Sequence, residues 1–497
     1  MRDPSTQGPV GAAPGPAARP EVESLQAYSA PLEGRRGLLR LDFNENTVGP
    51  SPRVVAAIRA IPADHYAIYP EYDGLRQAVI ASLQATPGGG GALQAAAGAP
   101  GTITATAQAS ASATAATTSA ATASATATAT AADTATATAA AKATASATTT
   151  GSTPAEPASA AALQPEQIGL FNGVDAAIHA VFQAYGGPGD RLLTTTPTFG
   201  YYTPCARMQG MAIEAIPYRL PDFSFPLEEI RAALLGPAPT GTEAWTPPRL
   251  LLLCNPNNPT GTRLAPERIL ELAAAAPQTL VVVDELYEAF TGDSVLPLLL
   301  GAAGGARGSD ANPSASASGP AVAVAAATSQ ASPGPAGADP FAAVPNLLVL
   351  RSLSKTAGIA GLRIGFAIGA AAVIDRISRV TGPYDINSFA VTAAHAALAD
   401  QAYVDAYVAE VLRARDWLVE QLRRAGVRHH VAGGNYLLLW PDRDPAAVDQ
   451  ELRAAGILVR SMAGKPLIDG SLRVSLGTRE QMERFWTTYR GLSGAGG

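Results

Sequence analysis

Residues 250–261 read LLLLCNPNNPTG, an apolar run that leads into a turn made of asparagine, proline, threonine and glycine. Two more short apolar runs follow, LVVV at 280–283 and LLVL at 347–350. Runs of this length are typical of buried parallel strands, and the periodic segment 266–276 between the first two is typical of a helix. This repeated alternation predicts an α/β fold with a mainly parallel sheet that is covered on both faces.

Polar residues follow each of these runs at the point where the predicted strand ends. Asn255 follows the first run, Asp284 ends the second, and SLSK at 352–355 follows the third. Open parallel sheets bind ligands beyond the carboxyl ends of their strands. The sequence therefore predicts that these three segments contribute to one site.

Two low-complexity tracts interrupt the pattern, at about 86–162 and 301–340. The first is mostly Ala, Thr and Ser, and the second is rich in Gly, Ala, Ser and Pro. Small side chains bury too little apolar surface to order a chain, so we expect surface-loop insertions and a disordered first tract. Residues 1–24 lack an apolar core segment and are expected to be a disordered tail, not a signal peptide.

The pattern changes near residue 389, where a long helical stretch at about 390–425 precedes three strand-like segments. These segments are 436–440, 457–460 and 472–475. They predict a smaller α+β domain, joined by the segment near 41–60. The expected divisions are an N-terminal arm with part of the small domain at 25–68, a large domain at 69–385 and a small domain at 386–490.

Composition excludes several classes of function. A net charge of −6 argues against general attraction to nucleic acid or anionic membranes, and the absence of long apolar stretches argues against a transmembrane helix. Cys205 and Cys254 lie far apart, which excludes a disulfide framework and is typical of the reducing cytoplasm. The five histidines do not form a cluster with metal-ligand spacing, so we expect no metal site.

Four motifs bear on the chemistry: NPNNPTG at 255–261, DELY at 284–287, SLSK at 352–355, and Arg363 eight residues beyond the lysine. Taken singly, each has an ordinary explanation, such as a solvated surface lysine or an Asp in a cap or turn. Together and in this order they resemble the fold-type I aminotransferases, which use pyridoxal 5′-phosphate. The resemblance implies that family's fold, a mainly parallel large domain with a smaller α+β domain.

The resemblance also implies roles around the ring of the cofactor. Lys355 would hold the cofactor as a Schiff base and later transfer the proton of the substrate carbon. Asp284 would keep the pyridine nitrogen protonated, which makes the ring an electron sink. Asn258 and Tyr287 would donate hydrogen bonds to the phenolic oxygen and so lower the pKa of the Schiff base.

Further residues match the family's contacts with the cofactor phosphate and with the face of the ring. The implied phosphate ligands are Ser352, Arg363 and the helix-starting turn of Gly173, Val174 and Asp175. The turn departs from the family pattern at Ala176, where an acidic residue is common. Phe199, in PTFGY, matches the aromatic residue that stacks on the ring, usually a tyrosine. The alternative for Phe199 is an ordinary core aromatic.

A finer resemblance, to the histidinol-phosphate aminotransferases, covers residues 25 to about 489. It is carried by LDFNENTVGPSP at 41–52, IYPEYDGLRQAV at 68–79, RSLSKTAGIAGLRIGFAIG at 351–369 and GPYDIN at 382–387. Tyr69 matches a tyrosine that reaches the cofactor phosphate from the partner subunit. This match implies a homodimer with shared active sites.

Substrate choice depends on three further matches. Arg473, in LRVSLGT, matches the arginine that holds a substrate carboxylate, and with Arg460 it matches the pair that binds the phosphate of histidinol phosphate. Tyr28 matches a tyrosine from the second subunit. The implied reaction converts histidinol phosphate and 2-oxoglutarate to imidazole-acetol phosphate and glutamate, in histidine biosynthesis. A structural arginine in a strand is the alternative for Arg460, and a surface arginine on a strand is the alternative for Arg473.

Three other functions share most of these motifs. An aromatic amino-acid aminotransferase is the nearest, since Phe199 would favour an apolar ring. A lyase of the same group, such as a threonine-phosphate decarboxylase, would release carbon dioxide without consuming 2-oxoglutarate. The third alternative is a non-catalytic regulatory or binding module on the same fold, and the presence of all the matched cofactor residues argues against it.

Overall fold

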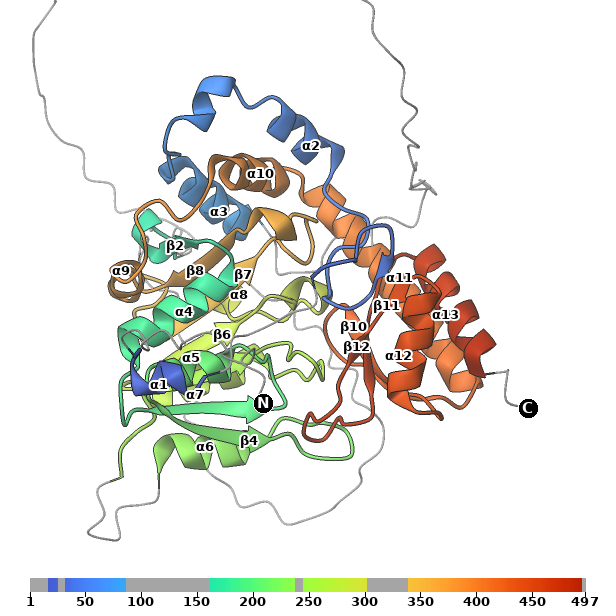
Figure 1. Cartoon of the computed structure of the whole chain (residues 1–497). Coiled ribbons are helices and arrows are strands. Elements are labelled where there is room, and N and C mark those ends of the chain that lie inside the picture. Colours follow the sequence, from blue (N-terminus) through green and yellow to red (C-terminus); the bar gives the residue numbers. More distant parts are fainter. Residues whose placement is uncertain (1–16, 26–31, 86–160, 237–244, 302–337, 494–497) are drawn as a thin grey trace, which may run out of the picture. The chain divides into compact units, whose positions relative to one another are not determined.

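The computed structural model describes residues 17–25, 32–85, 161–236, 245–301 and 338–493. Tyr28, most of the predicted tail and nearly all of both low-complexity tracts lie outside these described residues. The largest element is a seven-stranded sheet in the order β2-β8-β7-β6-β5-β3-β4 (Figure 1). Its strands are β2 (Ile168–Phe171), β3 (Arg191–Thr196), β4 (Ala212–Pro217), β5 (Leu250–Cys254), β6 (Leu280–Asp284), β7 (Leu347–Ser352) and β8 (Gly365–Gly369).

Strands β3 to β7 are mutually parallel, and only β8 runs antiparallel to its neighbours β2 and β7. The predicted α/β fold with a mainly parallel sheet is therefore confirmed. All residues of β5 and β6 are buried, which explains why these strands are apolar throughout instead of alternating. The surrounding helices and 3-10 segments are α4 (Val174–Tyr185), α5 (Tyr202–Met208), α6 (Leu227–Leu235), α7 (Pro266–Ala275), α8 (Leu296–Leu299), α9 (Ala371–Ser378), η3 (Pro165–Gln167), η4 (Glu288–Phe290) and η5 (Ala360–Leu362).

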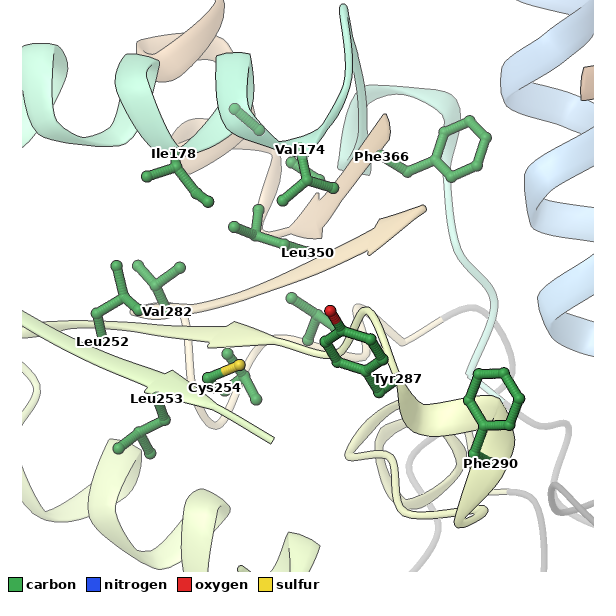
Figure 2. Packing of buried hydrophobic residues seen from close by; sticks show 14 of the residues in the cluster. Val174, Ile178, Leu252, Leu253, Cys254, Val282, Tyr287, Phe290, Leu350 and Phe366 are labelled. Carbon is green, nitrogen blue, oxygen red and sulfur yellow. The ribbon is translucent and has the colours of Figure 1, made fainter. Parts of the chain in front are cut away.

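Both faces of the sheet are packed against helices (Figure 2). Leu252, Val282 and Leu350 point to the side where α4 presents Val174 and Ile178, and all five side chains are buried. The next residue along β5, Leu253, points to the other side. Each buried aliphatic side chain of this size stabilises the fold by about 1.5–3 kcal/mol relative to exposure to water.

The register of the central strands brings their polar ends together. Cys254 pairs with Asp284, and Asp284 pairs with Leu350, so β5, β6 and β7 end at one edge of the sheet. Asn255 and Ser352 therefore lie within a few residues of Asp284 at this edge. The arrangement follows from parallel pairing, because parallel strands place their carboxyl ends on the same side.

A second, antiparallel sheet has the order β12-β13-β10-β9, and β1 forms a separate parallel pair with β11. The predicted single strand at 457–460 is wrong: it divides into β11 and β12, which pair with different partners. All described residues nevertheless belong to one compact unit. The elements of this part are β1 (Leu39–Arg40), β9 (Arg428–His430), β10 (Tyr436–Trp440), β11 (Ile457–Leu458), β12 (Arg460–Ser461), β13 (Leu472–Ser475), α11 (Gln401–Arg424), α12 (Pro445–Ala454) and α13 (Arg479–Ser493).

The long helix predicted at 390–425 is also divided, into α10 (Ser388–Leu398) and α11. The break falls at Ala399 and Asp400, and Asp favours non-helical positions because its side chain competes for backbone hydrogen bonds. In Figure 1, α10 packs beside α2 (Pro52–Arg59) and α3 (Asp73–Ala85). The short segment η1 (Ala63–Tyr66) lies between α2 and α3 in the sequence. The neighbours of α11 include α13 and β9, so the packing partners change between α10 and α11, at 399–400.

The end of the predicted N-terminal tail is structured. Residues Pro20–Glu23 form the short helix α1, with proline at a position that suits a helix start. The Arg19 guanidinium donates a hydrogen bond of 3.0 Å to the carbonyl oxygen of Met208 at the end of α5. The expectation of disorder up to residue 24 is therefore wrong for this last turn. Across the described residues, no helix combines the length and the apolar character that a membrane span requires.

Candidate active site

Lys355 lies just beyond β7, with its side chain only partly exposed. Its Nζ donates a hydrogen bond of 3.0 Å to the carbonyl oxygen of Phe43, in the N-terminal segment that follows β1. Burial, and then the nearby guanidinium groups of Arg473 and Arg363, lower the pKa of Lys355 to about 8. An amine with this pKa loses its proton close to neutral pH and can then act as a nucleophile or a base.

Asp284 ends β6 and is 2% exposed. Its Oδ2 accepts a hydrogen bond of 2.6 Å from the Tyr202 hydroxyl, and its Oδ1 accepts one from the backbone N–H of Leu286. Burial raises the pKa of Asp284 to about 6. Within the described part of the chain, none of the ion pairs involves this carboxyl group. A buried carboxylate of this kind fits a protonated ring nitrogen, which would supply the missing positive charge.

A chain of hydrogen bonds runs from Arg473 to the hydroxyl of Tyr287. Arg473 Nη1 donates to Asn258 Oδ1 at 2.7 Å, and Asn258 Nδ2 donates to Tyr287 Oη at 3.3 Å. Tyr287 Oη accepts a second hydrogen bond, of 3.0 Å, from Asn44 Nδ2. Four side chains from distant parts of the sequence thus form one buried polar network, and the sequence had pointed to three of them.

The start of α4 forms a narrow cradle with Arg363. Gly173 precedes the helix with φ +79°, and a Cβ there would lie 2.3 Å from Arg363 Nη2. Gly365 approaches just as closely, because a Cβ on it would lie 2.5 Å from the backbone nitrogen of Val174. Arg363 Nη2 also lies 2.9 Å from Asp175 Oδ2. A free helix N-terminus beside a guanidinium group is suited to a phosphate dianion.

Ser352 belongs to the same cradle through its strand register, because it pairs with Gly365 across β7 and β8. Its Oγ lies 2.8 Å from Ser354 Oγ and 3.1 Å from the carbonyl oxygen of Ile364. Five of the six residues that were predicted to bind the cofactor phosphate, all except Tyr69, therefore lie around the end of β7, the segment between η5 and β8, and the start of α4.

Phe199 is half-buried and packs on a hydrogen-bond partner of Asp284. Its ring packs edge-to-face on Tyr202 with centroids 5.5 Å apart, and the Tyr202 hydroxyl holds Asp284. An aromatic face, a carboxylate, an amine and an anion cradle are the four features that pyridoxal phosphate requires. The residues present therefore fit this cofactor.

Arg460 and Arg473 face each other as direct partners across β12 and β13. Neither takes part in an ion pair with a carboxylate among the described residues. Arg473 is 8% exposed and its Nη2 donates to the carbonyl oxygen of Asp42, but its buried Nε has no hydrogen-bond partner. The Arg460 guanidinium lies over the Phe43 ring, 5.5 Å from the centroid. Two like charges opposite each other repel, so an anion between them would be stabilised.

Two predicted residues are not joined to this group. Tyr69 is 68% exposed, and its ring stacks on Tyr384 with centroids 3.9 Å apart. Tyr28 lies outside the described residues. Sequence reasoning in turn missed the contacts of Tyr202 and Asn44. Tyr202 directly follows PTFGY, and Asn44 lies within LDFNEN, two stretches that carry the resemblance. A single sequence does not show which residues they contact.

Comparisons with known proteins show what the chain is similar to. The sequence profile of the family described as aminotransferase class I and II matches residues 100–488. The histidinol-phosphate aminotransferase of Paracoccus denitrificans is 30% identical over 324 residues, which are 65% of this chain and 74% of that protein. The protein of the same name from Streptomyces avermitilis is 30% identical over 331 residues, 66% of this chain and 74% of that protein.

Solved structures show the same fold. Histidinol-phosphate aminotransferase from Sinorhizobium meliloti, in complex with pyridoxal 5′-phosphate, has a TM-score of 0.62 at 18% identity and covers 95% of this chain and 97% of its own. L-threonine-O-3-phosphate decarboxylase from Porphyromonas gingivalis has a TM-score of 0.58 at 18% identity, covering 92% and 99%. Proteins named for two different reactions therefore share this architecture, so the fold alone does not identify the substrate.

Proposed function

Because the chain belongs to the class I and II aminotransferases, which depend on pyridoxal 5′-phosphate, we propose that it transfers the amino group of histidinol phosphate to 2-oxoglutarate. The products would be imidazole-acetol phosphate and glutamate, in a step of histidine biosynthesis in the cytoplasm. When bound, the cofactor supplies an electron sink for negative charge at the carbon that loses its proton. Side chains of the protein would bind the cofactor and the substrate and would move the proton.

In this proposal Lys355 is the covalent anchor of the cofactor and the group that moves the proton. Its pKa of about 8 leaves part of the amine unprotonated near neutral pH, so it can accept a proton and then return it. Asp284 would pair with the ring nitrogen, and Phe199 would pack on the ring face. Tyr287 and Asn258 would hold the phenolic oxygen, while Ser352, Arg363 and the turn of Gly173, Val174 and Asp175 would hold the phosphate.

The observation that carries the substrate proposal is the cross-strand pair of Arg460 and Arg473. Histidinol phosphate has no carboxylate, and its phosphate dianion would accept hydrogen bonds from both guanidinium groups. The partnerless Nε of Arg473 is one donor that such an anion could use. An aromatic amino acid offers one carboxylate, which Arg473 alone could bind.

A donor panel tests this proposal in the purified, cofactor-loaded protein. We expect kcat/KM for histidinol phosphate to exceed that for phenylalanine and for histidinol, which lacks the phosphate. Arg460→Ala should lower kcat/KM for histidinol phosphate by about 10²-fold, because a charge-assisted hydrogen bond contributes about 1.5–3 kcal/mol. The same change should reduce turnover of phenylalanine by less than about threefold.

Arg428→Ala is the matched control, because this arginine lies on the same small sheet but stacks on Trp440. It should leave the ratio of the two donors unchanged. A preference for phenylalanine that persists in the Arg460 variant would instead favour an aromatic amino-acid aminotransferase. Release of carbon dioxide from a phosphorylated amino acid without use of 2-oxoglutarate would favour a decarboxylase.

We also propose a homodimer in which each subunit completes the site of the other. The support comes from Tyr69, whose large exposed ring stacks on Tyr384 and, within the described part of the chain, forms no ring contact with the other predicted site residues. Tyr69 stacks on Tyr384, and Tyr66 nearby stacks on the exposed Phe389. Exposed aromatic groups of this kind are common where subunits meet.

A further inference from the structure

We propose that Asn44 is a positioning residue that determines the direction in which the Tyr287 hydroxyl donates its proton. The inference rests on the proposed placement of Tyr287 beside the phenolic oxygen of the cofactor. It adds a residue from the N-terminal segment that lies outside the four motifs. Asn44 acts through Tyr287 and needs no contact of its own with the cofactor.

The hydrogen-bonding capacity of a phenol group limits where the proton of Tyr287 can point. Tyr287 Oη accepts one bond from Asn44 Nδ2 at 3.0 Å and another from Asn258 Nδ2 at 3.3 Å. An amide nitrogen can only donate, so the Tyr287 proton can point toward neither asparagine. Tyr287 is 3% exposed, and burial raises its pKa well above the usual range, so the proton is retained. Among the described residues, no acceptor takes this proton, and it remains available to a ligand.

The orientation of each amide is determined by its other partner. Arg473 Nη1 lies 2.7 Å from Asn258 Oδ1, and because a guanidinium group has no acceptor, the amide oxygen must face it. The nitrogen of Asn258 is therefore turned toward Tyr287. This half of the arrangement depends on a residue that is already part of the proposed site.

Ser475 orients the amide of Asn44 in a similar way. Its Oγ accepts a hydrogen bond from the backbone N–H of Asn44 and donates one to Asn44 Oδ1, both at 2.9 Å. If the amide were reversed, the Ser475 hydroxyl would receive two donors and its own proton would have no acceptor. Ser475 is fully buried, so a missing bond would cost free energy and the observed orientation is favoured.

The backbone of Asn44 also suits this role. Its φ of 55° lies in the left-handed region, which asparagine tolerates better than most residues. Its carbonyl oxygen accepts a bond of 3.1 Å from Asn435 Nδ2, and the preceding carbonyl, of Phe43, accepts the bond from Lys355. One turn of the N-terminal segment therefore positions both the lysine amine and the tyrosine hydroxyl.

A hydroxyl that donates to the phenolic oxygen favours the unprotonated form of the bound cofactor. Losing that donor, or letting it rotate away, should raise the pH midpoint of the absorbance change of the bound cofactor. A hydrogen bond to a charged oxygen contributes enough to shift such a midpoint by about one to two pH units. The midpoint reports the direction of the hydroxyl independently of turnover.

The test compares Asn44→Gly, Ser475→Ala and Tyr287→Phe in the cofactor-loaded protein, with the first two also made in the Tyr287→Phe background. Glycine tolerates the positive φ of residue 44 and so removes only the side chain. We expect Tyr287→Phe to raise the midpoint by about one to two pH units and each of the other two by about half to one unit. Neither should add to the effect of Tyr287→Phe. Ser471→Ala, a change at another fully buried serine beside β13, should leave the midpoint unchanged.

The outcomes separate this inference from the proposed site. If Tyr287→Phe leaves the midpoint unchanged, the placement of Tyr287 beside the cofactor is wrong. If Tyr287→Phe raises it but Asn44→Gly and Ser475→Ala do not, the site stands and the role of Asn44 is overturned. A shift of equal size with and without the Tyr287 hydroxyl would also overturn it, since Asn44 would then act on the structure in general. The loss of cofactor affinity, measured by fluorescence titration, should likewise be larger for Tyr287→Phe than for Asn44→Gly or Ser475→Ala.

Discussion

Burial changes the protonation equilibrium of single residues in this site, and Asp284 is an example. Its pKa of about 6 compares with an ordinary value of 3.8, because the buried carboxyl group resists ionisation. In the cofactor-free protein, the raised pKa means that the folded state binds the Asp284 proton more tightly than the unfolded state does. The resulting contribution to the free energy of unfolding is fully present below the ordinary pKa. It is lost as the pH rises through about 6.

Asp284→Asn should therefore stabilise the cofactor-free protein increasingly as the pH rises. We expect the unfolding free energy of the variant minus that of the wild type to increase by about 1.5 kcal/mol between about pH 5 and about pH 8. Urea unfolding at several pH values measures this difference. Saturation with cofactor should remove the advantage, because a protonated ring nitrogen would compensate the wild-type charge. A pH-independent difference would contradict the assignment of a raised pKa.

At the scale of an element, the start of α4 depends on the absence of a side chain at residue 173. Gly173→Ala would introduce a Cβ 2.3 Å from the Arg363 guanidinium at a φ of +79°, so both the helix start and Arg363 must shift. We expect a loss of stability of about 1–3 kcal/mol and a loss of cofactor affinity of about tenfold or more. Thermal unfolding and cofactor titration measure the two effects.

Gly361→Ala is the control for this change, because it lies two residues before Arg363 and a Cβ there would meet nothing within 4 Å. It should leave cofactor affinity within about twofold of the wild type. Equal effects of the two substitutions would show that the cradle of α4 and Arg363 is not what holds the phosphate.

At the scale of the whole molecule, the proposed dimer predicts complementation between two defective chains. Lys355→Ala and Tyr69→Ala should each have little activity alone. If Tyr69 serves the partner's site, a mixed dimer has one site with both residues intact, so random re-association of equal amounts should restore about a quarter of wild-type activity. Refolding or subunit exchange followed by the donor assay measures this recovery. Activity that never exceeds the mean of the two separate variants would exclude shared sites.

Much of the fold could be predicted because its signals are local. The runs at 250–254 and 472–475 match β5 and β13, since an apolar segment bounded by turn residues has one plausible role in such a sheet. The break between α10 and α11 and the division of β11 from β12 could not be predicted in this way. The division of β11 from β12 depends on their different pairing partners, β1 and β13, and the break between α10 and α11 coincides with a change of packing neighbours.

The motifs, through their resemblance to the fold-type I aminotransferases, were enough to indicate the cofactor class and the residues that could bind it. How these residues contact one another became clear only from the folded chain. It placed Arg460 opposite Arg473, joined Tyr202 to Asp284, and brought Asn44 to Tyr287 across 243 positions of the chain. Hydrogen bonds act over about 3 Å, whatever the separation in sequence, so their partners become defined only when the chain is folded.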